Sequence, residues 1–167
     1  MREFVRAVDR LSTALAVVAA AFVLAAVLIV TYMIVVRLLG ASNYWEIELS
    51  IYLSVGAIFL ASPYALRTGG HVSVDLLPKL LPQAARPVLM TALRLVGLAV
   101  CVYLAWVSGE RFLESFHTGE RSNSLWKPLV WPLHLTMPVG LAMTALQFVV
   151  EILAPHRARD DAALTPL

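Results

Sequence analysis

One stretch near the start of the chain, from Thr13 to Val36, carries no charged residue over 24 positions. A helix rises about 1.5 Å per residue, so about 20 apolar residues are needed to cross roughly 30 Å of hydrocarbon. The hydrophobic region of a cleaved signal peptide is shorter, about 7–15 residues, and ends at a small-residue cleavage site. This run is longer and leads into Arg37, so we interpret it as a retained membrane-spanning helix.

Three further apolar segments are long enough to cross a bilayer, and they lie at Ile47–Leu66, Val88–Ser108 and Trp131–Val150. The composition agrees, because 60% of the residues are hydrophobic and 14% are charged, against about 45–50% and 25% in soluble domains. The sequence therefore predicts an all-α integral membrane protein. We expect its 167 residues to form a single membrane domain with four spans, at 13–36, 47–66, 88–108 and 131–150. Two helical hairpins are the natural division of four spans.

Two residues inside these spans need a structural explanation. Arg94 lies six residues into the third span, about 9 Å deep, and we expect its long side chain to reach back to the lipid headgroups. Gly140 lies in the fourth span. A glycine there would let another helix approach closely.

The distribution of Lys and Arg predicts that both termini are cytoplasmic. Eight basic residues lie in the amino-terminal segment, the second connection and the carboxyl tail, and four lie in the first and third connections. Cytoplasmic segments carry the excess of basic residues. Four aromatic residues are the predicted interfacial anchors on the outer side, where Tyr44 and Trp45 flank the second span and Trp126 and Trp131 flank the fourth.

Several classes of function are excluded by what the sequence lacks. The net charge of +2 is too small for a nucleic-acid-binding domain. Cys101 is the only cysteine, so no disulfide can form within the chain, and no spacing of Cys and His residues predicts a metal site. We also see no nucleophile–base pair and no phosphate-binding loop. We therefore expect neither an enzyme nor a chain with its own cofactor.

Two acidic residues mark the start of the second span. Glu46 is expected at a water-exposed helix start, where the helix dipole favours a negative charge. Glu48 precedes an apolar run, so we place it inside the membrane boundary, facing a polar group of a protein rather than lipid. Arg67 closes the same span 19 residues later, about 28 Å along a helix. We expect Glu48 and Arg67 to find separate partners.

The second connection combines a polar motif with an amphipathic segment. In Arg67-Thr-Gly-Gly-His71-Val-Ser-Val-Asp75, His71 and Asp75 would share one face of a helix. Two interpretations stand here, a capped loop satisfied locally and a contact surface for another membrane subunit. From Leu76 to Pro87, pairs of leucines alternate with Pro, Lys and Arg. This pattern predicts a short amphipathic segment lying in the headgroup plane between the second and third helices.

These motifs occur together in a known order. From about Asp9 to Val150 the chain resembles the small permease subunit (DctQ type) of tripartite ATP-independent periplasmic, or TRAP, transporters. The resemblance rests on Arg37-Leu-Leu-Gly, Trp45-Glu-Ile-Glu48, Arg67-Thr-Gly-Gly-His71-Val-Ser-Val-Asp75, Gly119-Glu-Arg-Ser, Pro138-Val-Gly140 and Gln147. It implies a contact or folding role for Glu48, Arg67, His71 and Asp75.

The resemblance also implies partners and a location. A separate large permease subunit would carry the substrate and sodium sites, and a periplasmic solute-binding protein would deliver an organic acid. The small subunit would scaffold the large one in a bacterial inner membrane, and uptake would be driven by a sodium gradient.

Two other classes of function remain open from the sequence. A self-contained small antiporter would need a membrane-embedded carboxylate, for which Glu48 is the candidate. A membrane anchor for a redox enzyme would copurify with haem or flavin.

Overall fold

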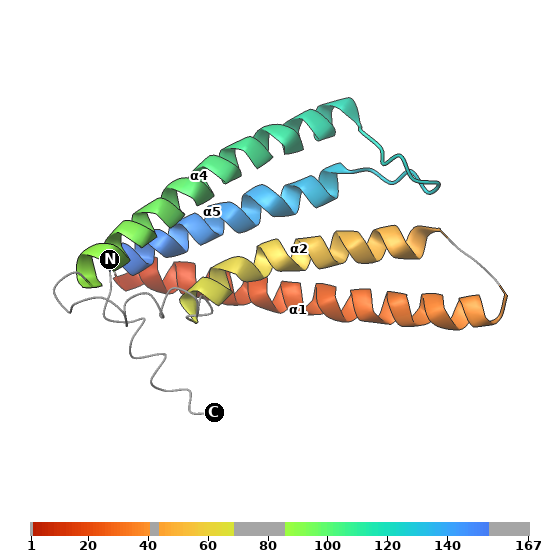
Figure 1. Cartoon of the computed structure of the whole chain (residues 1–167), viewed down its shortest axis with the longest axis horizontal. Coiled ribbons are helices and arrows are strands. Elements are labelled where there is room, and N and C mark those ends of the chain that lie inside the picture. Colours follow the sequence, from red (N-terminus) through yellow and green to blue (C-terminus); the bar gives the residue numbers. More distant parts are fainter. Residues whose placement is uncertain (1, 41–43, 69–85, 154–167) are drawn as a thin grey trace.

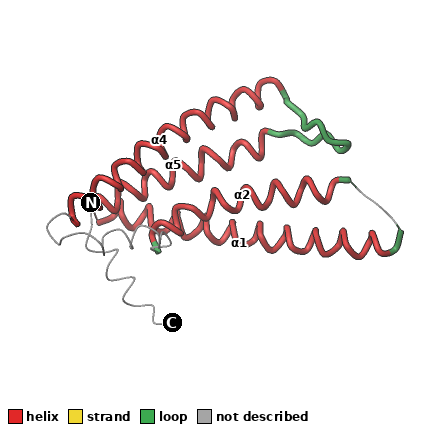
Figure 2. Tube along the Cα trace, viewed as in Figure 1, coloured by secondary structure: helices red, strands yellow, loops and turns green. Residues whose placement is uncertain are grey.

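Four long helices make up most of the part of the chain that the computed structural model describes, which comprises residues 2–40, 44–68 and 86–153 (Figures 1 and 2). The helices are α1 (Arg2–Leu38), α2 (Trp45–Arg67), α4 (Arg86–Thr118) and α5 (Trp131–Leu153). Each is long and apolar enough to cross a membrane, so the predicted all-α, four-span fold is confirmed. His71, Asp75 and most of the predicted amphipathic segment lie outside the described residues.

The helices continue beyond the predicted spans. α4 runs ten residues past Ser108, because the polar sequence that follows still forms helix. Arg111 Nη1 donates to Glu114 Oε2 at 2.8 Å, and such a pair three residues apart stabilises a helix. Gly119, with φ of +61°, follows the last residue of α4 and fits the left-handed conformation that ends many helices.

The helices form two antiparallel hairpins, placed side by side in the order α1, α2, α5, α4 (Figure 1). α2 and α5 join the hairpins, whereas α1 and α4 form the two edges of the row. We call the end that holds the start of α1 and the end of α5 the terminal end. The opposite end, with the end of α1, the start of α2 and the loop 119–130, is the hairpin end.

The joint between the hairpins depends on close backbone approach. A Cβ atom added to Gly140 of α5 would collide with the carbonyl oxygen of Phe59 in α2, so no other residue fits there without a shift. The expectation that Gly140 admits a neighbouring helix is confirmed. Next to this joint, Ala19 of α1 packs with Ala57 and Leu60 of α2 in a small apolar cluster.

Candidate functional site

A polar network at the terminal end begins with Arg67, in the last turn of α2. Its Nε lies 3.7 Å from Asp9 Oδ1 of α1. Its Nη1 donates to Thr13 Oγ1 at 3.2 Å and to the Asp9 carbonyl oxygen at 3.4 Å. Asp9 and Thr13 are four residues apart and share a face of α1, so one guanidinium group can reach both.

The network continues into α5 through two buried side chains. Ser12 Oγ donates to Gln147 Oε1 at 3.3 Å, and Gln147 Nε2 donates to Asp9 Oδ1 at 3.5 Å. Both Ser12 and Gln147 are buried. Asp9 therefore connects three helices, and we call the set the three-helix network (Asp9, Ser12, Thr13, Arg67 and Gln147).

A second charged contact at the terminal end joins α4 to α5. Arg94 Nε lies 3.6 Å from Glu151 Oε2, and Arg94 Nη1 donates to the Glu151 carbonyl oxygen at 3.4 Å. The antiparallel hairpin brings an opposite charge to the level of Arg94, so its side chain has a partner within the protein; the expectation that it reaches the headgroups stays a prediction. The signal for this pair was present in the sequence, since Glu151 directly follows the predicted fourth span.

At the hairpin end, Glu48 accepts a hydrogen bond from Ser124 Oγ in the 119–130 loop. Ser124 Oγ also accepts from the Lys127 backbone N–H at 3.1 Å, and an isolated bridge between Arg121 and Leu129 closes the loop. The second hairpin thus contacts the first turn of α2. Glu48 and Arg67 have separate partners, as their spacing predicted.

Glu46 differs from the sequence-based expectation. It is 1% exposed, and neither of its carboxylate oxygens has a hydrogen-bond partner among the described residues, so the prediction of a water-exposed position is wrong. Eleven residues, about three helical turns, separate Glu46 from the buried Ala57. Glu46 therefore lies on the inward face of α2, whereas Glu48 is only partly buried.

Three of the four predicted aromatic anchors form ring contacts at the hairpin end. The Trp45 ring centroid lies 6.3 Å from that of Tyr32 and 6.5 Å from that of Trp126. Trp131 meets Phe116 edge to face at 5.7 Å. Tyr44 is exposed. These contacts define an aromatic level that touches all four helices.

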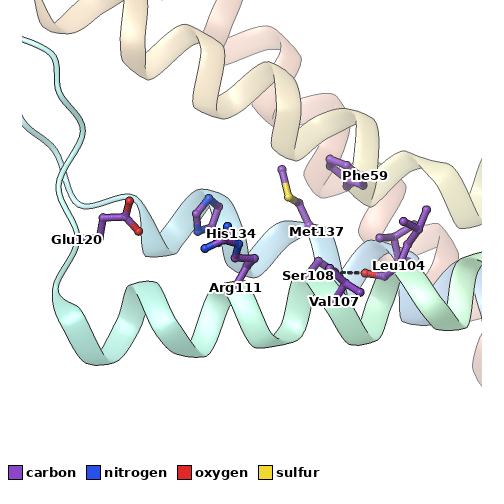
Figure 3. A pocket seen from close by; sticks show the side chains of 9 residues that line it. Phe59, Leu104, Val107, Ser108, Arg111, Glu120, His134 and Met137 are labelled. Atoms are coloured by element: carbon purple, nitrogen blue, oxygen red, sulfur yellow. Dashed lines mark hydrogen bonds between the residues drawn. The ribbon is translucent and has the colours of Figure 1, made fainter.

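An open pocket of about 530 Å³ lies between α2, α4 and α5 near this level (Figure 3). Its hairpin-end side is polar, with Arg111, Glu120 and His134, whereas its deeper side is lined by Phe59, Leu104 and Leu141. The buried Ser115 Oγ lies 2.7 Å from His134 Nδ1 and donates to Glu120 Oε2 at 3.1 Å. Sequence reasoning missed this polar side because its residues come from two helices and a loop.

The described residues contain no group of three or more His, Cys, Asp or Glu side chains placed to bind a metal ion. These residues form ion pairs at the terminal end and an amphipathic pocket nearer the hairpin end. Such groups hold helices together and accept other membrane components. The contact role predicted for Glu48, Arg67, His71 and Asp75 stays a prediction.

Comparisons with known proteins give two similarities. A family model described as "Tripartite ATP-independent periplasmic transporters, DctQ component" matches residues 26–157. A protein of Halomonas elongata named "Ectoine TRAP transporter small permease protein TeaB" is 25% identical over 122 residues. The matched region covers 73% of this chain and 63% of that relative.

Proposed function

Because the chain belongs to the DctQ family of TRAP transporters, we propose that it is the small subunit that scaffolds a large permease subunit. The complex takes up an organic acid delivered by a solute-binding protein, and a sodium gradient drives the uptake. Sodium binds to the large subunit, and this chain holds no cofactor. The single observation that carries the proposal is the family match over residues 26–157.

The arrangement of the helices supports a scaffolding role. The four spans stand in a row, whereas a carrier working alone places ionisable groups near the bilayer midplane, at the interface between its repeats. Within the described residues, the buried carboxylate of Glu46 lies in the first turn of α2, at the hairpin end. It therefore does not supply a midplane ion site.

The proposed location is the bacterial inner membrane, with the terminal end in the cytoplasm. The excess of basic residues in the segments at this end supports that orientation. Reporter fusions after residues 42 and 120 should report outside, and fusions after residue 75 and at the carboxyl end should report inside. An outside signal from the carboxyl end would overturn the orientation.

Reconstitution into liposomes tests the function. We expect no sodium-driven uptake of an organic acid by this chain alone, and uptake when the large permease and the cognate binding protein are added. Liposomes that contain the large permease and the binding protein without this chain are the control. Uptake by this chain alone would favour the small-antiporter alternative, and full uptake in the control would remove the need for a scaffold.

A further inference from the structure

Two levels of the molecule indicate where the bilayer lies. The charged contacts of Asp9, Arg67, Arg94 and Glu151 mark one level, and the aromatic contacts of Tyr32, Trp45, Phe116 and Trp131 mark the other. Along every helix, the two levels are 20 to 23 residues apart, which is about 30–35 Å. This distance matches a hydrocarbon core of about 30 Å. All four helices therefore indicate the same position of the bilayer, between the two levels.

This placement extends the membrane-embedded part of α4 beyond the predicted end at Ser108 and puts polar groups inside the hydrocarbon, of which Arg111 is paired with Glu114. Glu110 and Trp106 precede Phe116 by six and ten residues, which places them about 9 Å and 15 Å below the aromatic level. Trp106 Nε1 donates to Glu110 Oε1 at 3.0 Å. Trp side chains favour the membrane interface rather than its centre, and ionisable residues at such depth face protein or water rather than lipid.

These groups point away from the rest of the chain. Ser115 of α4 is buried and contacts His134 of α5. Trp106 is nine residues from Ser115, about two and a half turns, and so lies on the opposite face. Trp106 is 70% exposed and Tyr103 is 68% exposed. Together with Glu110 they form one exposed stripe with spacings of three and four residues, which we call the α4 ridge (Tyr103, Trp106 and Glu110).

The other edge of the row shows what a lipid-facing surface looks like in this protein. The exposed side chains of α1 between residues 14 and 36 are almost entirely apolar, as at Leu24 and Leu28. The hydroxyl of Thr31 there donates to the carbonyl oxygen of Val27 at 2.8 Å. Hydrocarbon can cover that face without leaving a polar group unsatisfied, but it cannot do so for the carboxylate of Glu110.

We propose that the α4 ridge packs against a membrane helix of the large permease subunit, which presents a cationic or hydrogen-bond-donating side chain to Glu110. Trp106 donates one hydrogen bond to the Glu110 carboxylate. The carboxylate can accept further hydrogen bonds, so the partner should offer a donor or a positive charge. The assignment rests on the proposed function, which supplies the partner. It adds which face of this chain forms the interface.

Photo-crosslinking in the co-expressed complex tests the assignment. We place p-benzoylphenylalanine at position 103 of the α4 ridge in one sample and at position 28 of α1 in another. We expect a product that contains the large permease, identified by mass spectrometry, from position 103 and none from position 28. The proposal is overturned by the reverse pattern, by a product with a second copy of this chain, or by no product from position 103.

A charge substitution gives an independent measurement. Glu110→Gln keeps the size of the side chain and an acceptor for Trp106 but removes the charge. We expect roughly three- to twentyfold less large permease to copurify, the range measured for single polar contacts between membrane helices. Glu114→Gln, which alters an exposed carboxylate paired with Arg111, is the matched control and should copurify normally.

The same purification separates the two proposals. If the unmodified chain fails to copurify the large permease, the proposed function itself fails. If it copurifies normally and Glu110→Gln does so equally well, the function stands and the α4 ridge is not the interface. Size-exclusion chromatography of each variant without the partner shows whether the chain is folded.

Discussion

The two edge helices of the row, α1 and α4, are fixed to the molecule in different ways. α1 packs along α2 and also reaches α5, and it buries Val5, Val8, Ser12, Ala19 and Ala26. Among the described helices α4 packs mainly along α5, and Ser115 is its only buried residue within the part of its side chains that is described. α1 is therefore held by two other helices of this chain, whereas α4 has the exposed face that we propose as the interface with the large permease.

The largest expected effect comes from the joint that both edges depend on. In Gly140→Ala the new Cβ would collide with the Phe59 backbone, so α2 and α5 must separate. We expect a loss of about 3 kcal/mol in the free energy of unfolding, measured by thermal unfolding in detergent. Gly109→Ala, where nothing lies within 4 Å, is the control and should be neutral or gain up to about 1 kcal/mol. Equal stability of the two variants would contradict the close contact.

A smaller effect, confined to the α4 edge, should follow from breaking its charged contact. Arg94→Leu leaves the Glu151 carboxylate without its cation and should cost roughly 3 kcal/mol or less. Arg94→Leu with Glu151→Leu strands no charge and should cost less than the single change. The rate of alkylation of Cys101, the only cysteine and a half-buried residue of α4, reports whether α4 has left α5. A double variant less stable than the single one would show that the pair is not coupled.

Losing the cation that pairs with α1, Arg67 of α2, should cost less stability than losing Arg94. Arg67→Gln removes the ion pair with Asp9, but the buried contact between Ser12 and Gln147 remains. We expect a loss of about 1 kcal/mol, with no change in the alkylation rate of Cys101. Arg10→Gln, at an exposed neighbouring position, is the control. An increase in Cys101 alkylation would mean that the two edges are not independent.

The smallest effect on the chain itself is expected at the contact between the hairpins. Glu48→Gln can still accept the hydrogen bond from Ser124, so the free energy of unfolding should change by less than about 1 kcal/mol. If Glu48 also contacts the large permease, the yield of complex should fall while transport per assembled complex stays the same. Normal yield with abolished transport would place Glu48 on the transport path instead.

The sequence predicted those features of the fold that depend on local properties. The length of the run from Thr13 to Val36 fixes a span, and Gly140 indicates a close contact wherever its neighbour lies. Which helix packs against Gly140 depends on the order of the four helices in the molecule. No local sequence pattern specifies that order. The contact between Arg94 and Glu151, 57 residues apart, depends on the pairing of α4 with α5 in one hairpin, so the sequence carried a signal for it.

The two acidic residues of α2 show a second limit. Glu46 and Glu48 are two residues apart, so they point about 200° away from each other on a helix. At most one of them can therefore face inward, and the packing of α2 against its neighbouring helices decides which. Sequence reasoning expected Glu46 to be exposed to water and Glu48 to face a polar group of a protein; the structure buries Glu46 and gives Glu48 a contact with Ser124. Positions 71 and 75 lie outside the described residues, so the roles predicted for them stay predictions.

α4 packs mainly against α5. This packing has a consequence for protein synthesis, which proceeds from the amino terminus. α1 and α2 leave the ribosome next to each other and can pair in the membrane at once. α4 follows with Arg94 and has no packing partner until α5 is complete, because Glu151 lies 57 residues later. A lone helix with a charge inside its span inserts poorly. We therefore expect the second hairpin to enter the bilayer as a pair.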